Sequence, residues 1–373
     1  MILTNTTSGG TATGGWQQRL HLDATLLAAI VVLCGVGLVV LYSASDQSMN
    51  MVMRQVIRLG IAFATLLVIA QIPPGILYRW TPWLFGIGCL LLAAVLVFGD
   101  VGKGAQRWLD LVVVRFQPSE MMKLAVPMMV AWYLADQRLP PKAARLAVAG
   151  VIIVVPVVLI AKQPDLGTAL LIASAGFFVL FMAGLRWRLL GILVLVAAAC
   201  APLLWHFMHG YQRQRVLTFL NPESDPLGAG YHIIQSKIAI GSGGVYGKGW
   251  LNGTQSHLDF LPESATDFIF AVLGEEFGLI GILLLLVLYL FIVFRCMYIA
   301  TQAQDTFTRL LGGSLALTFF VYVIVNTGMV TGLLPVVGLP LPLISYGGTS
   351  MVTLMAGFGI LMSIHTHRKL LPT

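Results

Sequence analysis

The segment Leu261-Pro-Glu-Ser-Ala-Thr-Asp267-Phe-Ile-Phe-Ala-Val-Leu-Gly-Glu275-Glu276 marks the point at which a long polar stretch gives way to an apolar run that continues to residue 294. Such a run is long enough for a helix to cross a membrane, because about 20 apolar residues span about 30 Å of hydrocarbon. Carboxylates at a membrane boundary are energetically costly and invite a functional explanation. The segment therefore predicts both a membrane protein and the neighbourhood of its functional site.

The composition supports a membrane protein throughout. Of the 373 residues, 58% are hydrophobic and only 10% are charged, and the mean hydropathy is +0.89. This chain is too apolar for a soluble domain, and its apolar segments lack the alternation of a transmembrane β-barrel. The expected fold is an all-α polytopic membrane protein of about ten transmembrane helices. The predicted spans cover residues 24–43, 56–72, 81–99, 119–135, 145–161, 167–185, 188–207, 267–294, 308–334 and 344–364.

The chain is expected to form one domain. Residues 1–20 are a polar cytoplasmic leader, and residues 21–373 form a single transmembrane domain. A cleaved signal peptide is not predicted, because the leader is polar and the first apolar run is long enough to span the membrane. One large external loop, residues 208–266, joins the seventh and eighth predicted spans.

The basic residues predict the orientation in the membrane. Ten spans put both termini on one side, and Lys and Arg then divide 11 and 11 between the two sides. The positive-inside rule applies to short loops, and without the large loop the division is 11 against 7 in favour of cytoplasmic termini. We therefore expect both termini in the cytoplasm and the large loop outside. The net charge of +7 is scattered over many links and predicts no nucleic-acid partner.

The cysteines and histidines predict no metal site. The four cysteines lie in apolar spans, or just past the end of one, and lack the spacing of metal ligands. We interpret them as small hydrophobic residues. The histidines around the large loop form no HExxH-like pattern, so no zinc site is expected.

The large loop contains two recognisable stretches. Tyr231, Ile234 and Ile238 recur at helical spacing and predict an amphipathic interfacial helix. The glycine-rich stretch Gly241–Gly249 follows it and has the general look of a phosphate-binding loop. It departs from both the Walker and the dinucleotide-binding patterns, so no nucleotide site is predicted.

Prolines and glycines interrupt the chain between the ninth and tenth predicted spans. Irregular backbone at membrane depth persists only where it is buried in protein or lines a water-filled cavity. We therefore expect a cavity that opens on the outer face. The interrupting residues are Pro335, Gly338, Pro340, Pro342, Gly347 and Gly348.

Five stretches in register follow one family pattern: Gln163–Thr168, Pro222–Tyr231, Gln235–Gly244, Leu261–Phe270 and Pro342–Gly348. Their residues and order resemble the SEDS family (shape, elongation, division and sporulation) of bacterial cell-envelope proteins. The match covers nearly the whole chain. Within the family, the short leader and the stretches Lys103–Asp110 and Tyr211–Arg215 are similar to the elongation branch.

The resemblance implies a peptidoglycan glycosyltransferase that polymerises lipid II on the outer face of the bacterial inner membrane during cell elongation. Its chemistry joins the 4-hydroxyl of an acceptor sugar to the anomeric carbon of a donor, and undecaprenyl pyrophosphate leaves. This reaction calls for a general base and for cations near the departing phosphates. By resemblance the base is Asp267, and partial burial would raise its pKa and strengthen it as a base.

The residues alone offer a second interpretation of Asp267. Thr266-Asp267 before an apolar run is typical of a helix N-cap, although the resemblance favours catalysis. Asp259 and Glu263 are weaker candidates for the base, because their loop is expected to be solvated.

Four further charged residues are predicted near the cavity. Glu275 and Glu276 are adjacent on one helix and cannot face the same way, so one is expected to line the cavity and the other to find a neutralising partner or stay protonated. Glu120 and Lys123 are three residues apart, which allows an intrahelical ion pair. This pair is interpreted as a structural brace, with substrate contact as the alternative.

Arg213 and Arg215 are the predicted ligands of the pyrophosphate, because the planar guanidinium group matches phosphate oxygens. A basic anchor at the lipid headgroups is the alternative. Further cations that the sequence does not rank are Lys237, Lys248, Arg54 and Arg107.

Two cavity candidates have competing structural roles. Trp108 is expected either to stack against a sugar or to lie at the membrane interface, where tryptophan is common. Asp165 stands at the start of the sixth predicted span, where helix capping is the default role.

The alternative function is a lipid II flippase or transporter, for which a polar cavity and broken helices would also serve. The concentration of acids and glycines in the outer half favours external chemistry.

The chain has no segment that resembles a transpeptidase, so the resemblance implies a class B penicillin-binding protein as partner, beside other elongation-complex membrane proteins and the lipid bilayer. No cofactor is certain; a divalent cation, Mg²⁺ or Mn²⁺, that bridges Asp267 and the pyrophosphate is chemically reasonable.

Overall fold

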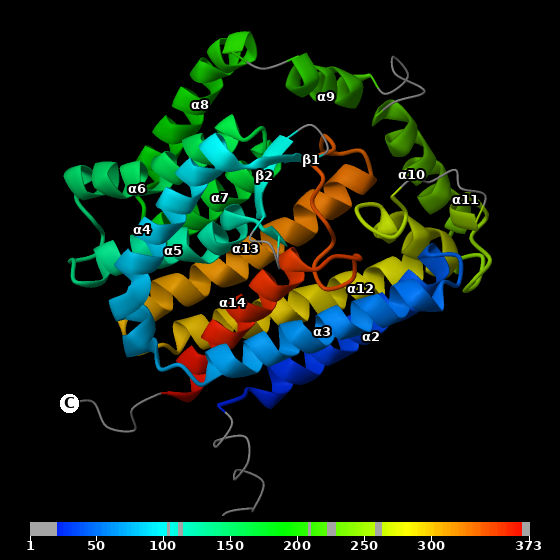
Figure 1. Ribbon diagram of the computed structural model, residues 1–373, viewed down its shortest axis with the longest axis horizontal. Coiled ribbons are helices and arrows are strands. Elements are labelled where there is room, and N and C mark those ends of the chain that lie inside the picture. The colour runs from blue at the N-terminus through cyan, green and yellow to red at the C-terminus, as the bar shows by residue number, and fades with distance from the viewer. Residues whose placement is uncertain are drawn as a thin grey trace, which may run out of the picture.

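The computed structural model describes residues 21–102, 105–110, 115–207, 210–221, 229–257 and 263–367. Each predicted span coincides with one helix, and these helices form a bundle (Figure 1). The helices are α2 (Ala24–Ala44), α3 (Met49–Ala70), α4 (Pro74–Phe98), α5 (Pro118–Ala135), α6 (Ala143–Lys162), α7 (Leu166–Met182), α8 (Trp187–Phe207), α12 (Ile269–Thr301), α13 (Thr306–Val330) and α14 (Thr349–Thr366).

The prediction of a multi-pass helical membrane protein is confirmed. Within the described residues, seven helices are long and apolar enough to cross a membrane, namely α2, α3, α4, α6, α12, α13 and α14. The remaining predicted spans coincide with α5, α7 and α8, so the number of ten stays a prediction.

The link between α4 and α5 contains a small sheet that the sequence analysis did not predict. Strands β1 (Asp100–Gly102), β2 (Ala105–Asp110) and β3 (Arg115–Phe116) pair in the order β1-β2-β3, and both pairings are antiparallel. Runs of two to six residues carry too little periodicity to be recognised in a sequence. The all-α class therefore holds for the bundle but not for this link.

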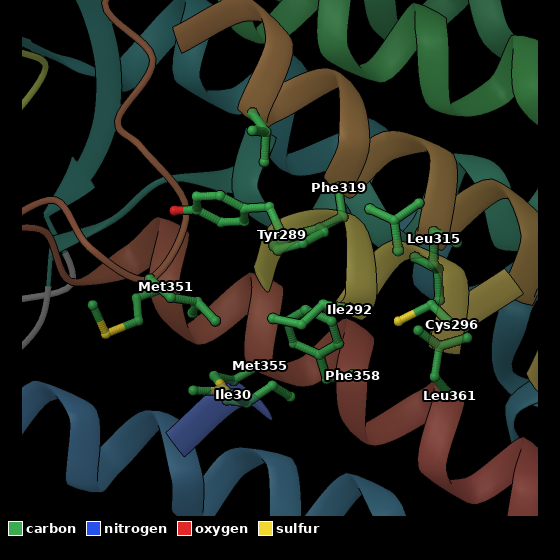
Figure 2. Packing of buried hydrophobic residues seen from close by; sticks show 14 of the residues in the cluster. Ile30, Tyr289, Ile292, Cys296, Leu315, Phe319, Met351, Met355, Phe358 and Leu361 are labelled. Carbon is green, nitrogen blue, oxygen red and sulfur yellow. The ribbon is translucent and has the colours of Figure 1, made fainter. Parts of the chain in front are cut away.

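The core forms where α12, α13 and α14 meet. Tyr289 of α12 lies 5.8 Å from Phe319 of α13, and Phe319 contacts Phe358 of α14 edge to face at 5.1 Å between ring centroids. Figure 2 shows these rings with Ile292 and Leu361 around them. Interlocking apolar side chains of this kind hold the helices at fixed positions through dispersion contacts.

The two described ends of the chain lie together at one end of the bundle, here called the terminal end. The rings of His21 and His367 are stacked with their centroids 3.9 Å apart. Asp23, the N-cap of α2, forms an ion pair with Arg295 of α12 at 2.6 Å. Helix α12 continues past this ion pair to Thr301, whereas the predicted membrane span ends at residue 294.

A break in α12 is filled by the glycine-rich loop. Gly278 has φ +63° and ψ −162°, which no helix allows. The break frees the N–H groups of Leu279 and Ile280, and these donate to the oxygens of Gly244 and Val245 at 3.0 and 3.2 Å. Unsatisfied backbone groups in a membrane are costly, so this pairing stabilises the broken helix.

The freed carbonyl groups on the other side of the break are also satisfied. The backbone N–H groups of Lys248 and Gly249 donate to the backbone oxygens of Glu275 and Glu276, each at 3.0 Å. Gly247 must be glycine, because a Cβ there would lie 2.1 Å from the oxygen of Glu276. The glycine-rich stretch Gly241–Gly249, which has the general look of a phosphate-binding loop, therefore has a structural role.

The large loop contains α9 (Gly210–Leu220), α10 (Ala229–Gly243) and α11 (Thr254–His257). The predicted helix at Tyr231–Ile238 is thus confirmed as part of α10. The face that α10 buries carries Ile233, Ser236 and Ala239, whereas Ile238 is 47% exposed. Contact of that exposed face with lipid stays a prediction.

Candidate functional site

A polar cavity of about 510 Å³ lies at the end of the bundle opposite the terminal end. Its walls come from β2, the starts of α5, α7 and α14, the residue before the N-cap of α12, and the link 335–340. The proline and glycine residues that interrupt the chain line it as expected, with the exception of Pro342. Its polar lining residues are Arg107, Gln117, Glu120, Lys123, Asp165, Thr168, Asp267, Thr349 and Ser350.

Asp267 lines this cavity as a half-buried residue. The N-cap position of α12 is occupied by Phe268, so Asp267 does not hold the capping position that was its alternative interpretation. The link passes close by, because a Cβ built on Gly338 would lie 3.5 Å from Oδ2 of Asp267. Gly338 has φ +74°, a conformation that suits glycine.

Buried side chains fix the backbone around Asp267. The side-chain amide nitrogen of Asn326 in α13 donates to the backbone oxygen of Asp267 at 2.9 Å and to the backbone oxygen of Leu339 at 2.7 Å. The hydroxyl group of Ser345 donates to the oxygen of Thr266 at 2.5 Å. Asn326 is fully buried, so these bonds are shielded from water. The position of the carboxylate is therefore set by α13 and by the link to α14.

A histidine of the large loop lies beside the same turn. His232 of α10 stacks on Phe268 with ring centroids 5.7 Å apart and planes inclined by 19°. Burial lowers the pKa of His232 and outweighs the opposite effect of Glu263. The ring is thus neutral at neutral pH, and α10 contacts the residue next to Asp267 through it.

Asp165 combines a capping role with a place in the cavity. Its carboxylate accepts a hydrogen bond from the N–H of Thr168 at 3.3 Å and so caps α7, as predicted. Its second oxygen lies 3.8 Å from Nε of Arg107 and accepts from Gln117 at 3.4 Å. Arg107 also donates to the oxygen of Pro164 at 2.7 Å. Asp165 therefore orients a cavity cation as well as a helix.

Glu120 and Lys123 form the predicted ion pair, with Nζ 2.7 Å from Oε1, and both side chains are buried. Nζ also lies 5.5 Å from the ring centroid of Tyr322, within cation–π distance. Within the described residues, Oε2 of Glu120 has no hydrogen-bond partner. The pair is thus a brace between α5 and α13 that also faces the cavity.

Trp108 does not line the cavity, although its neighbour Arg107 does. Successive side chains of a strand point to opposite faces, and both residues belong to β2. Trp108 is paired with Asp100 of β1 and is half-buried. The structure therefore does not support the expected stacking of Trp108 on a sugar in this cavity.

The expectation that Glu275 or Glu276 lines the cavity is wrong. Glu275 is fully buried, forms an ion pair with Lys248 at 2.7 Å and accepts from the N–H of Thr254 at 2.9 Å. Glu276 accepts a hydrogen bond from the hydroxyl group of Ser43 in α2. These carboxylates therefore face the large loop and α2 instead of the cavity.

Two predicted cations, Arg213 and Lys237, are also absent from the cavity wall. Arg213 lies on α9 and Lys237 is exposed on α10, and neither lines the cavity. The side chain of Arg215 lies outside the described residues, as does Asp259. The match of a guanidinium group to phosphate oxygens does not place a residue in space, and Lys237 belongs to α10, which packs against α12 and α13. Among the described residues, the cations that line the cavity are Arg107 and Lys123.

Two site residues were missed in the sequence. Asn326 is a polar residue inside an apolar span, which is itself a signal of function or of a structural hydrogen bond. Gln117 precedes α5 and bridges to Asp165, and no local pattern marks it. The tertiary fold brings Asn326 to Asp267 and Gln117 to Asp165.

The described part of the chain offers no ready-made cage for a metal ion. No group of three histidine, cysteine or carboxylate side chains there is arranged to hold one. Asp165 is engaged by Arg107, and Glu120 by Lys123. A divalent ion would therefore take Asp267 and the substrate phosphates as ligands, which is the manner in which Mg²⁺ is commonly bound. This ion stays a prediction.

The cavity and bundle define a polytopic membrane protein with a charged site at one end, and comparisons place it among known proteins. The family model described as "cell cycle protein", which covers FtsW, RodA and SpoVE, matches residues 24–370. The chain is 57% identical to the peptidoglycan glycosyltransferase MrdB of Escherichia coli K12, covering 95% of this chain and 96% of that one. It is 38% identical to the probable peptidoglycan glycosyltransferase FtsW of Trichlorobacter lovleyi, covering 94% of each.

Solved structures agree with this placement. A chain from a peptidoglycan synthase complex that coordinates polymerization and crosslinking superposes with a TM-score of 0.82 at 32% identity, covering 93% of this chain and 98% of that one. The rod shape determining protein RodA of Thermus thermophilus gives a TM-score of 0.71 at 28% identity, covering 93% and 98%. The chain belongs to the FtsW/RodA/SpoVE family. The resemblance to the SEDS family seen in its motifs is thereby confirmed.

Proposed function

We propose that this protein polymerises lipid II into glycan strands, with Asp267 of the polar cavity as the general base. The expectation of a peptidoglycan glycosyltransferase is confirmed by relatives of that name that match nearly the whole chain. The observation that carries the role of Asp267 is its place in a cavity that also holds Arg107 and Lys123.

The proposed reaction uses the carboxylate and the cations in separate roles. The oxygen of the acceptor 4-hydroxyl forms a bond to the anomeric carbon of the donor, and Asp267 accepts the proton of that hydroxyl group. The bond from that carbon to the lipid pyrophosphate breaks, and the electron pair leaves with the pyrophosphate. Arg107 and Lys123 stabilise the negative charge that develops on the leaving group.

Arg107 is the favoured pyrophosphate ligand in this proposal. Its guanidinium group lines the cavity and is held by Asp165 and by the oxygen of Pro164, so its direction is fixed before substrate binds. Preorganised donors stabilise developing charge better than mobile ones, because no reorganisation is needed during the reaction. The guanidinium group has more donor hydrogens than its contacts with Asp165 and Pro164 use, so the others can bind phosphate oxygens.

The polarity of the bundle supports catalysis over transport. A transporter needs a polar path that is reachable alternately from both sides. The charged cavity residues lie at one end, whereas Asp23 and Arg295 at the terminal end are paired with each other. We further propose that the cavity faces the periplasm, that both termini are cytoplasmic and that the membrane is the bacterial inner membrane.

The partner is proposed to be a class B penicillin-binding protein that crosslinks the glycan product. Its support is the likeness to a chain solved in a peptidoglycan synthase complex. Binding of lipid II and of other elongation-complex proteins belongs to the same proposal.

The decisive experiment is glycan polymerisation from purified lipid II by the full chain with a class B penicillin-binding protein. Asp267→Asn is compared with the wild type and with Asp305→Asn, which removes an exposed carboxylate from the N-cap of α13. We expect polymer from the wild type and the control, and none from Asp267→Asn at equal thermal stability. Equal polymer from all three would exclude Asp267 as the base, and no polymer from any would favour transport.

A further inference from the structure

A second cavity, of about 430 Å³, lies between the link that joins α5 to α6 and the link that joins α7 to α8. Basic and apolar side chains line it together, and it is called the basic cavity here. The residues that matter are Lys142, Arg186, Arg188, Leu146, Leu189 and Ile192.

The basic cavity lies far from the polar cavity. Helix α7 begins next to Asp165, in the polar cavity, and ends at Met182, two residues before Gly184 of the basic cavity. A helix of 17 residues is about 25 Å long, which is close to the thickness of the hydrocarbon layer. The basic cavity is therefore at the membrane surface opposite the proposed catalytic site.

The three cations of the basic cavity have no ion-pair partner in the part of the chain that the structure describes. Lys142, Arg186 and Arg188 are exposed, and none of them forms an ion pair with the described residues. Like charges repel one another, so their clustering costs free energy unless an anion binds there. This contrasts with Arg107, Lys123, Lys248 and Arg295, each of which is paired with a carboxylate.

Two helix ends add to the positive potential. Lys142 is the N-cap of α6 and makes no side-chain capping bond, and α8 begins at Trp187 between the two arginines. The N-terminus of a helix carries a partial positive charge and free N–H groups. These ends reinforce the attraction that the side chains already exert on an anion.

The surroundings indicate a ligand with an apolar part. Leu146, Leu189 and Ile192 line the same cavity as the cations. Trp187 is 78% exposed between Arg186 and Arg188, and tryptophan at such a position is typical of the headgroup level of a membrane. An inorganic anion would use the cations alone, whereas a phospholipid would use both surfaces.

We propose that the basic cavity binds an anionic phospholipid, whose phosphodiester group contacts Lys142, Arg186 and Arg188 and whose acyl chains lie along Leu146 and Ile192. Basic pockets between transmembrane helices bind anionic headgroups in this way. The site is separate from the catalytic cavity, so it holds whether or not Asp267 is the base.

The test measures lipid retained by the purified full chain in native mass spectrometry, with phosphatidylglycerol, phosphatidylcholine and inorganic phosphate as probes. The triple variant Lys142→Gln/Arg186→Gln/Arg188→Gln removes the cations. The control Arg79→Gln/Lys162→Gln/Arg309→Gln removes equal charge from exposed positions outside the cavity. We expect the wild type and the control to prefer phosphatidylglycerol, and the triple variant to bind it at least about tenfold more weakly.

A second readout reports on the site itself. Phosphatidylglycerol with brominated acyl chains should quench tryptophan fluorescence less in Trp187→Phe than in the wild type, because Trp187 lies beside the cavity. Equal retention of phosphatidylglycerol by the triple variant and the control would overturn the proposal. Competition by inorganic phosphate at equal concentration would overturn it as well and would indicate a simple anion site.

Discussion

The side-chain amide of Asn326 donates hydrogen bonds to the backbone oxygens of both Asp267 and Leu339, at 2.9 and 2.7 Å. One buried side chain of α13 thereby joins the turn before α12 to the link before α14. The proposed base is thus held by a helix that is remote in sequence. Asn326 is a positioning residue in this arrangement, because it touches the backbone and not the carboxylate.

Asn326→Ala should lower both the rate of polymerisation and the stability of the folded protein. Loss of two buried hydrogen bonds leaves backbone acceptors without their donor, which costs about 2 kcal/mol of folding free energy. We expect kcat to fall by at least about tenfold while KM changes little, because a small displacement of the base affects the transition state. Thr327→Ala is the matched control, since its hydroxyl group donates to the backbone of its own helix and to no other described segment. Equal kinetics for the two variants would contradict a positioning role.

The ion pair of Glu120 and Lys123 should behave as a brace. Glu120→Gln alone leaves a buried ammonium group without its partner and should cost about 3–5 kcal/mol. The double variant Glu120→Gln/Lys123→Met should recover most of that loss in thermal stability. Because Lys123 is also proposed to stabilise the leaving group, the double variant should be stable and yet much less active. Lys123→Met is measured as the second single variant. If the loss of stability in the double variant equals the sum of the two single losses, the residues do not stabilise each other.

The glycine loop that fills the break in α12 gives a steric prediction. Gly247→Ala should destabilise the protein by about 2–4 kcal/mol, because φ is +82° and the new Cβ would lie 2.1 Å from the oxygen of Glu276. Gly241→Ala is the control, because a Cβ at that position meets no atom within 4 Å. Thermal unfolding in nanodiscs measures both. A tolerated Gly247→Ala would mean that the loop does not contact α12 as described.

The terminal end predicts a loss of stability in acid. Burial by itself would raise the pKa of Asp23, but hydrogen bonds from His365, Arg295 and the N–H of Leu26 outweigh it and lower the pKa. A carboxylate whose pKa is lower in the folded state stabilises the protein above its unfolded pKa of about 4. This contribution is lost as the pH falls below that value toward the folded pKa.

Asp23→Asn should therefore unfold at a lower temperature than the wild type at pH 7, and the two should converge on acidification. Asp305→Asn should behave like the wild type at every pH, since its side chain makes no capping bond. A difference between Asp23→Asn and the wild type that stays constant down to about pH 3 would contradict this account.

The sequence by itself determined the class, the family and most of the helix positions. Apolar runs of about 20 residues predict spans because hydrocarbon accepts only backbone that is satisfied within its own segment. Local rules also sufficed for the cap at Asp165 and for the pair of Glu120 with Lys123, since each joins residues three apart on one helix. Five motifs in order were enough to indicate the family, and the comparisons confirmed it.

Only the tertiary structure decided which charged residues share the cavity. Arg107 lines the cavity because strand β2 brings it there, and Asn326 of the remote helix α13 fixes the backbone at Asp267, whereas Glu275 and Glu276 contact the large loop and α2. Single-sequence rules act within one segment and do not report which other segment a side chain will face. The physical reason is that backbone groups freed by the break must pair with another segment, and the glycine loop that supplies the pairs also carries Lys248 to Glu275.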